Sequence, residues 1–273
     1  MHAYIQKAKR IRFEWPMQST QVTPLNILRD KKYAGILCYP KYNAEETMKR
    51  IRQLEKLGVT AIHFTGRKKA FDLSVLGKGN VGIVVVADTK TGQAALKIRR
   101  VDADRKGMQH EAEMLSKANS LGIGPRLINK EEDFLLMEFI NGSLLPDWLA
   151  CLKGRNSRNR IRIVLLDLLE QCHRLDQAGL DHGELSRAPK HVIVDAGDKP
   201  HIVDFETASV MRRTSNVTSI SQYLFMKSQL ARILGRRLGK IDQEALIDKL
   251  RNYKHKPTRQ NFDAILRTCR LIR

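Results

Sequence analysis

Cysteine is scarce in this 273-residue chain and long apolar runs are missing, which together exclude several classes of protein. The four cysteines stand singly and form no C-x-x-C pair, which argues against a structural zinc site and a disulfide framework. No apolar run approaches the roughly 20 residues that span a bilayer. The N-terminal residues are followed by no apolar stretch with a cleavage site, so we expect a cytoplasmic protein that binds no membrane.

Acidic residues are too few to balance the basic ones. The chain has 49 Lys and Arg against 29 Asp and Glu, a net charge of +20. Residues 1–70 and 205–273 each hold 15 basic and 5 acidic residues, whereas residues 71–204 hold 19 of each. A neutral centre between two basic flanks predicts chemistry in the centre and docking of the flanks on RNA or a ribonucleoprotein. The alternative is that the excess charge only solvates exposed helix faces.

Hydrophobic patterning predicts an α+β fold, with a β-rich half followed by an α-rich half. Before residue 71 we expect buried strands at 33–39 and 59–64, joined by a helix that Asn43 caps. From residue 71 to residue 98, β-branched runs and tight turns predict an antiparallel meander. The remaining pattern predicts strands at 134–139, 191–195 and 201–205, and helices at 107–121, 158–179, 219–238, 243–252 and 258–272.

A glycine-rich string over residues 77–84 has the spacing G-x-G-x-x-G-x-V. A P-loop needs Lys followed by Ser or Thr after its last glycine, and a dinucleotide fold needs a helix there. This chain continues instead as strand, turn and strand, which leaves the hairpin that covers ATP phosphates in protein kinases. A hairpin without a ligand is the alternative. In the kinase interpretation the nucleotide-binding positions are Gly77, Gly79, Gly82 and Val84.

Lys97 ends the string Ala94–Lys97, which matches the V-A-I-K strand of protein kinases. A lysine at this place reaches the α and β phosphates of ATP, and Ala95 leaves room for the adenine ring. The lysine needs a carboxylate on the following helix, where Glu111 and Glu113 are the candidates. Glu111 lies on the apolar face of that helix and Glu113 does not, so we predict that Glu111 pairs with Lys97.

Two acidic positions follow on a loop and on the hairpin after it. Glu184 lies in the string His-Gly-Glu-Leu, and Asp204 lies in Val-Asp-Phe-Glu. In phosphoryl transfer one carboxylate orients the attacking hydroxyl and another holds Mg²⁺ across the phosphates. Glu184 and Asp204, 20 residues apart, suit these two roles. The glycine loop, the lysine, the helix glutamate and the two acidic loops occur in the order that a kinase requires.

This ordered set resembles the small atypical serine/threonine protein kinases of the RIO type and of the KEOPS tRNA-modification complex, over about residues 71–210. The string Leu136–Ile140 looks like the hinge of these kinases, so the resemblance implies that adenine binds at Glu138 and Ile140. It also implies ATP and Mg²⁺ as cofactors and a bilobal fold. The expected parts are a basic extension packed on the N-lobe (1–70), an N-lobe with hinge (71–140) and a compact helical C-lobe (141–273).

The chain departs from the family pattern at two positions. Glu184 replaces the family's aspartate, and the extra methylene matters because a displacement near 1 Å can cost about 10²-fold in rate. The metal-binding asparagine is missing, and alignment on the following strand puts His191 in its place, so we expect metal ligation by Asp204 and His191. These departures motivate an alternative function, an ATP-binding pseudokinase scaffold. A phosphotransferase for a small hydroxyl or amino substrate is a third hypothesis. No role follows from the sequence for Glu206.

Overall fold

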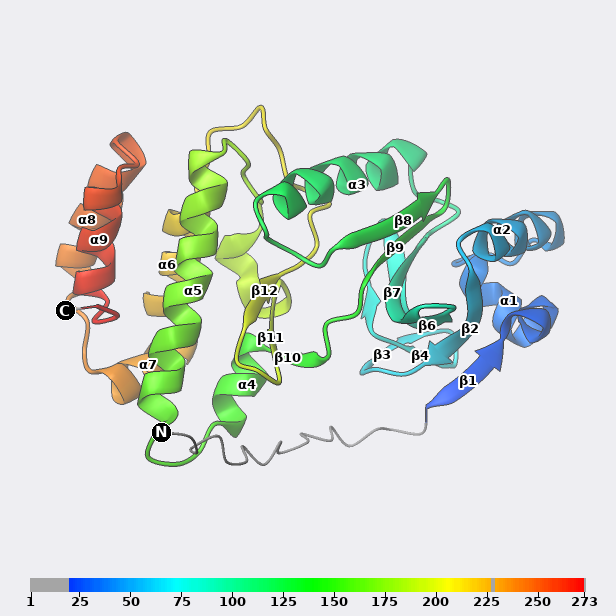
Figure 1. Ribbon diagram of the computed structural model, residues 1–273, viewed down its shortest axis with the longest axis horizontal. Helices are drawn as coiled ribbons and strands as arrows, with labels where there is room; N and C mark the ends of the chain where they lie inside the picture. Colours follow the sequence, from blue (N-terminus) through cyan, green and yellow to red (C-terminus); the bar gives the residue numbers. More distant parts are fainter. Residues whose placement is uncertain (1–19, 227–228, 273) are drawn as a thin grey trace, which may run out of the picture.

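The computed structural model describes residues 20–226 and 229–272, and it shows an antiparallel sheet followed by helices (Figure 1). The fold is therefore mixed α+β, as the patterning predicts. The rest of the basic N-terminal flank, residues 1–19, lies outside the described residues. The main sheet has the strand order β1 (Gln21–Pro24), β2 (Val59–Phe64), β6 (Gly82–Thr89), β7 (Gly92–Arg99), β9 (Phe134–Glu138) and β8 (Leu127–Glu131), with β5 (Gly77–Lys78) paired to β6.

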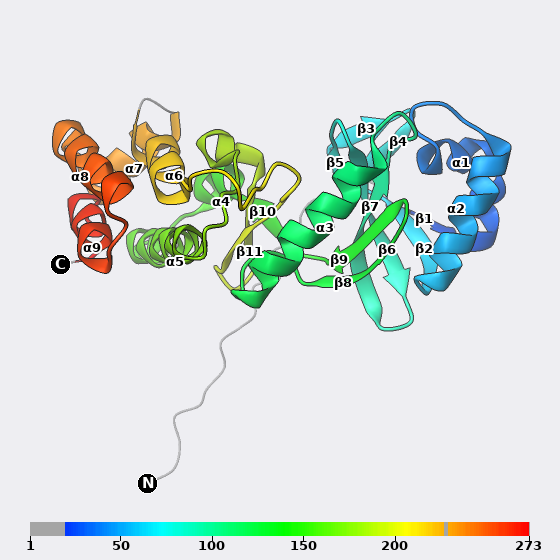
Figure 2. The same ribbon diagram turned by 90° about the horizontal axis from the view of Figure 1, so that it is seen from above.

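The β6–β7 hairpin forms the centre of this sheet. Its strands pair without a break from Gly82 opposite Arg99 to Thr89 opposite Gly92. Gly92 closes the turn at φ +124°, a backbone conformation that side chains rarely adopt. The buried residues Ile83, Val85 and Ala87 of β6 belong to the hydrophobic cluster that the sheet forms with α1 (Lys31–Leu37) and α2 (Ala44–Lys56), while α3 (Arg105–Ser120) contacts β8 and β9 (Figure 2).

The segment 33–39, predicted as a strand, is instead helix α1 (Lys31–Leu37), and this prediction is wrong. Asp30 caps the helix, its carboxylate accepting from the Lys32 N–H at 2.9 Å, and a short apolar run does not by itself distinguish a buried strand from a buried helix. The helix that follows, α2 (Ala44–Lys56), is capped by Asn43 as predicted. Strand β2 then pairs with both β1 and β6, so the strands at 21–24 and 59–64 are part of the main sheet.

The second half of the chain is mainly helical and adds one small sheet, with strand order β10, β11 and β12. The predicted helix at 219–238 is two helices, because the backbone becomes extended at Met226. The remaining elements are β3 (Lys68–Ala70), β4 (Leu73–Val75), β10 (Gly142–Leu144), α4 (Leu145–Cys151), α5 (Ser157–Gln177), the 3₁₀ turns Leu25–Arg29 and Leu185–Lys190, β11 (Val192–Asp195), β12 (Pro200–Ile202), α6 (Asn216–Phe225), α7 (Gln229–Leu238), α8 (Gln243–His255) and α9 (Arg259–Thr268).

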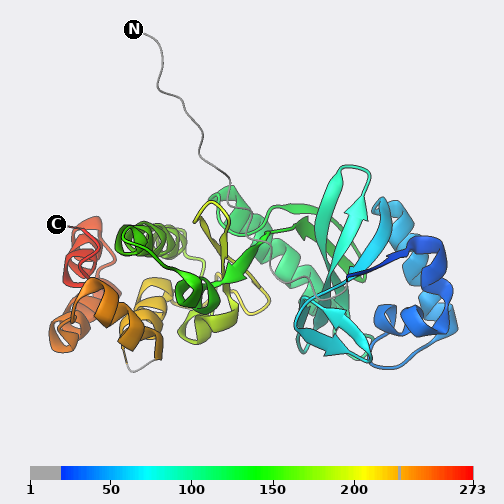
Figure 3. The same cartoon turned by 90° about the horizontal axis from the view of Figure 1, so that it is seen from below.

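Two hydrophobic clusters divide the interior. One lies between the main sheet and helices α1 and α2, and the other runs from the inner face of α3 through α5 to α9. Figures 1 and 3 agree in placing the sheet at one end of the molecule and α5 to α9 at the other. Side chains from both parts therefore meet between β7, α3 and β12. Among the described residues no helix is long and apolar enough to cross a bilayer.

Candidate functional site

Five acidic or basic side chains that the sequence singled out come together where the sheet meets the helical part. Lys97 comes from β7 and Glu111 from α3. Asp204 lies just after β12, while Glu184 and His191 flank the 3₁₀ turn Leu185–Lys190. The structure thus collects these residues from positions up to 107 residues apart in the chain.

The centre of the site is the ion pair between Lys97 and Glu111. Lys97 Nζ lies 2.6 Å from Glu111 Oε2, and the two residues are only 5% and 2% exposed. Burial acts to lower the pKa of Lys97, but the surrounding carboxylates outweigh it and raise the pKa above its ordinary value. Burial raises the pKa of Glu111, and the Lys97 ammonium offsets only part of that rise. Lys97 therefore remains a fixed positive charge in this site.

Asp204 and Glu206 face the same ammonium. Lys97 Nζ lies 3.4 Å from Asp204 Oδ1 and 3.0 Å from Glu206 Oε2. Burial acts to raise the pKa of Asp204, but Lys97 and then His191 more than compensate, and the pKa lies below its ordinary value. Asp204 adopts φ +71°, a left-handed backbone that turns the chain sharply after β12. The sequence analysis assigns no role to Glu206, and the structure adds this residue to the site.

Glu184 and Asp204 are bridged by a buried histidine. His191 Nε2 lies 2.8 Å from Glu184 Oε2, and His191 Nδ1 lies 3.7 Å from Asp204 Oδ2. Burial and, to a smaller extent, the charge of Lys190 lower the pKa of His191 by more than Asp204 and Glu184 raise it. Lys190 approaches Glu184 from solvent at 3.7 Å. A neutral imidazole carries a single N–H, and of the two His191 contacts only the 2.8 Å one to Glu184 is short enough for a hydrogen bond.

Behind this bridge, His182 and Asn216 fix the loop that carries Glu184. The His182 ring is wholly buried, and burial together with the charge of His191 lowers its pKa to about 4, so it is neutral at pH 7. The neutral ring donates from Nε2 to the Val203 carbonyl at 3.1 Å. The buried Asn216 amide accepts from the His182 N–H and donates to the Leu180 carbonyl, each at 2.8 Å. Sequence reasoning assigned a site role to neither residue, because each acts through the backbone.

The glycine-rich string forms the hairpin β5–β6 beside Lys97. The Gly79 N–H closes its turn on the Gly82 carbonyl at 2.8 Å. A Cβ on Gly82 would lie 2.9 Å from a carbonyl oxygen of β7 and 3.1 Å from Lys97 Cγ, whereas one on Gly79 would meet nothing nearer than 3.8 Å. Gly82 thus leaves the passage that the Lys97 side chain needs. Val84 pairs directly with Lys97, and Gly77 pairs with Val84.

The predicted hinge follows the strand next to β7. Ala95 pairs with Met137, and β9 ends at Glu138, so Ala95 lies beside the segment that reaches Ile140. The Glu138 N–H is already bound to the Arg126 carbonyl at 2.8 Å. It is therefore not a free donor for a ligand in this conformation.

The donor set of the site fits Mg²⁺. Carboxylate oxygens of Glu111, Asp204 and Glu206 lie within 4.8 Å of one another, and so do the donor atoms of Glu184, His191 and Asp204. Mg²⁺ prefers oxygen ligands and is usually held by one or two carboxylates together with substrate phosphates. Three carboxylates share the single Lys97 ammonium, which leaves net negative charge for a cation. Since Glu111 is committed to Lys97, Asp204 and Glu206 are the oxygen donors that remain.

Comparison with known proteins gives a distant relation to one protein kinase. No family model matches the chain. Over 132 residues, 44% of this chain, it is 33% identical to the serine/threonine-protein kinase YabT of Bacillus subtilis, and this match spans 36% of that kinase. Over 103 residues, 38% of this chain, it is 28% identical to an uncharacterized protein of Methanocaldococcus jannaschii, across 84% of that protein. The similarity to a serine/threonine kinase is therefore distant and covers less than half of either chain.

Proposed function

We propose that this chain is an ATP- and Mg²⁺-dependent atypical serine/threonine protein kinase with a bilobal, kinase-like arrangement of its two cores. The observation that carries the proposal is the buried Lys97–Glu111 pair at 2.6 Å with Asp204 facing the same ammonium. A lysine on a strand, a glutamate on the next helix and a metal-binding aspartate are the parts that position ATP in protein kinases. The distant similarity to a serine/threonine kinase supports the same class. The proposal keeps the three expected parts, which are an extension on the N-lobe (1–70), the N-lobe with its hinge (71–140) and the C-lobe (141–273).

In this proposal the phosphates lie between the glycine hairpin and the acidic cluster. Lys97, oriented by Glu111, contacts the α and β phosphates. Asp204 and Glu206 would hold Mg²⁺, which would supply positive charge to offset that of the phosphates. We favour Glu206 over the predicted His191 as the second ligand, because Mg²⁺ prefers oxygen ligands to imidazole and the Glu206 and Asp204 carboxylates lie together at Lys97.

Glu184 is the residue that receives the acceptor proton in this proposal. Its carboxylate is partly exposed, and one oxygen is occupied by His191 at 2.8 Å. The other Glu184 oxygen accepts the proton of a serine or threonine hydroxyl. The hydroxyl oxygen then bonds to the γ phosphorus of ATP while the bond between that phosphorus and ADP breaks. The contact with His191 orients the Glu184 carboxylate, and this orientation compensates for the extra methylene that glutamate has relative to aspartate.

Label transfer from γ-labelled ATP tests the proposal. We expect transfer to the protein itself or to a basic protein substrate, and its loss in Lys97→Ala and Asp204→Ala. Lys90→Ala, an exposed lysine in the β6–β7 turn, is the matched control and keeps activity. No transfer by the wild type, with ATP still raising its melting temperature, would favour the scaffold function instead.

Glu184→Asp separates a kinase adapted to glutamate from a scaffold. Shortening the side chain withdraws the carboxylate from His191, so an adapted kinase loses rate, by about 10²-fold for a displacement near 1 Å. A scaffold gains activity or stays inactive. Glu206→Gln is the companion variant for metal ligation, and we expect it to raise the Mg²⁺ concentration needed for half-maximal transfer.

We also propose that the basic flanks dock on RNA or a ribonucleoprotein. In the described part of the chain, a hollow between α7 and α8 is lined by Arg232, Arg236, Lys240 and Arg270 together with two carboxylates. Arg232→Glu and Arg236→Glu should weaken RNA binding and flatten its dependence on salt. Charge reversal is a better test than deleting the N-terminal flank, because β2 is a strand of the main sheet. Binding that salt does not affect would contradict the proposal.

A further inference from the structure

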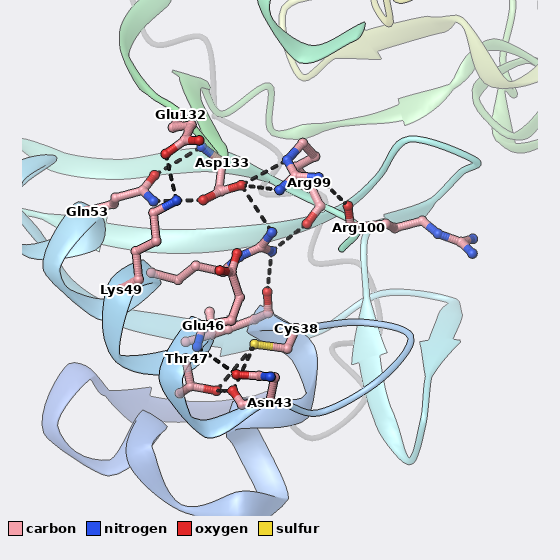
Figure 4. A network of polar contacts seen from close by, with 12 residues as sticks. Cys38, Asn43, Glu46, Thr47, Lys49, Gln53, Arg99, Arg100, Glu132 and Asp133 are labelled. Carbon is pink, nitrogen blue, oxygen red and sulfur yellow. Dashed lines mark hydrogen bonds and ion pairs between the residues drawn. The ribbon is translucent and has the colours of Figure 1, made fainter. Parts of the chain in front are cut away.

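A buried polar network joins helix α2 to the strand that carries Lys97 (Figure 4). Its centre is Asp133, a wholly buried residue in the turn between β8 and β9. Asp133 accepts hydrogen bonds from Gln53 at 2.7 Å, from Arg50 at 3.1 Å and from Arg99 at 2.8 Å. Its own N–H donates to the Gln53 side-chain oxygen at 3.0 Å. Burial acts to raise the pKa of Asp133, but these partners overcome that effect and lower it, so the carboxylate is ionised.

Arg50 is the residue of α2 that reaches furthest into this network. Its side chain is 0% exposed although it carries a charge. It donates to Glu46 at 2.7 Å, to the Arg99 carbonyl at 2.5 Å, to Asp133 and to the Leu37 carbonyl at the end of α1. A buried guanidinium with its donors distributed in this way fixes several backbone segments relative to one another.

From Arg99 the network continues to both parts of the nucleotide site. Arg99 lies two residues after Lys97 on β7, and its guanidinium donates to the Ala103 carbonyl at 2.7 Å, just before the start of α3. The neighbouring Arg100 donates from its N–H to the Val81 carbonyl at 2.8 Å and from its side chain to the Gly79 carbonyl at 3.3 Å. Arg50 therefore connects through Arg99 to the helix of Glu111, and through Arg99 and its neighbour Arg100 to the glycine hairpin.

A second, independent link joins the same two helices at the surface. Glu132, next to Asp133 in the turn, forms an ion pair with Lys49 of α2 at 2.8 Å and another with Arg105, the first residue of α3. Helix α2 thus contacts the start of α3 through a buried route and an exposed one. The contacts of α2 are directed at the elements that set the distance between Lys97 and Glu111.

We propose that Arg50 is a positioning residue for the nucleotide site: through Asp133 and Arg99 it holds the start of α3 and the glycine hairpin in the geometry that binds ATP. The inference rests on the proposed ATP-binding function and deepens it. Helices α1 and α2 then act as a built-in positioning element of the site.

The test compares Arg50→Lys with Arg52→Lys in the same helix. Lysine keeps the charge at position 50, but its three donors lie on one nitrogen and cannot serve all four acceptors of Arg50. Arg52 is exposed and serves as the matched control. Gln53→Met, which removes the two Gln53 hydrogen bonds with Asp133 and leaves those of Arg50, is a milder second variant in case Arg50→Lys folds poorly. All variants are measured at a temperature where melting curves show that they are fully folded.

For Arg50→Lys we expect the dissociation constant of a fluorescent ATP analogue to rise about tenfold. Hydrogen exchange of the nucleotide-free protein should become faster at residues 79–81 and 104–112, with no change in α5. Gln53→Met should show smaller changes in the same direction, and Arg52→Lys none. The dissociation constant separates positioning from stability alone, since a purely structural role lowers the melting temperature without changing the affinity of the folded protein.

Unchanged exchange at 79–81 and 104–112 in both Arg50→Lys and Gln53→Met would overturn the inference, as would unchanged nucleotide affinity in a wild type that binds. A wild type that binds no ATP analogue would refute the proposed function alone, because the exchange measurement needs no nucleotide and still tests the positioning by Arg50.

Discussion

Replacing His182 with glutamine should make the protein less sensitive to acid. The ring is wholly buried, and burial together with the charge of His191 lowers its pKa from 6.5 to about 4. Between these two values the unfolded chain binds the proton and the folded protein does not, so acid favours unfolding. The contribution of neutral His182 to stability is complete above pH 6.5 and is lost as the pH falls toward 4. Between pH 7 and pH 5 this amounts to ~2 kcal/mol of unfolding free energy.

Urea unfolding at pH 7 and at pH 5, followed by circular dichroism and tryptophan fluorescence, measures this difference. The glutamine amide keeps a donor for the Val203 carbonyl but has no proton to gain. We expect the wild type to lose ~2 kcal/mol more than His182→Gln over this interval. His255→Gln, at the exposed end of α8, is the control and should behave as the wild type. Equal losses in the wild type and His182→Gln would refute the assignment of a buried neutral ring.

Three further predictions concern packing and buried charge, and each is measured by the unfolding free energy. Gly82→Ala should lower the unfolding free energy by about 1–3 kcal/mol, because the added Cβ would lie 2.9 Å from a backbone oxygen. Gly79→Ala, whose Cβ would have no neighbour nearer than 3.8 Å, should lower it less. Equal losses in the two variants would contradict the crowding at Gly82. Lys97→Met should lower the unfolding free energy by about 3 kcal/mol, because it leaves Glu111 buried without a partner. Adding Glu111→Gln should restore part of that loss. Additive effects of the two substitutions would contradict the buried ion pair. Asn216→Ala should cost about 3 kcal/mol, since its amide serves three buried partners, and a loss below 1 kcal/mol would show that those bonds are dispensable.

Much of the site follows from periodicity in the sequence. The choice of Glu111 over Glu113 needed only the apolar face of one helix, and the structure places Glu111 within 2.6 Å of Lys97. The β6–β7 hairpin likewise followed from β-branched strands around a glycine turn. In both cases the prediction depends on the pattern of residues within one helix or one hairpin, so the local sequence is enough to make it.

Other parts depend on contacts that local patterns do not encode. The apolar run at 33–39 is compatible with a buried strand and with a buried helix. The Asp30 cap and burial against the sheet favour the helix. The Asp133 network is similar in this respect. Arg50 looks like an ordinary basic residue of an amphipathic helix, and only the fold brings it to a carboxylate 83 residues further along the chain.

Glu206 shows how one backbone angle places a residue that the sequence left without a role. The left-handed φ of +71° at Asp204 turns the chain after β12, and the next side chain, Phe205, enters the core and packs on His182 with ring centroids 5.1 Å apart. Asp204 and Glu206 lie on either side of this buried residue, and both carboxylates contact Lys97 Nζ, at 3.4 Å and 3.0 Å. In the proposed function, Glu206 stands where the kinase string Asp-Phe-Gly has glycine, and it would supply a second oxygen ligand in place of the missing asparagine.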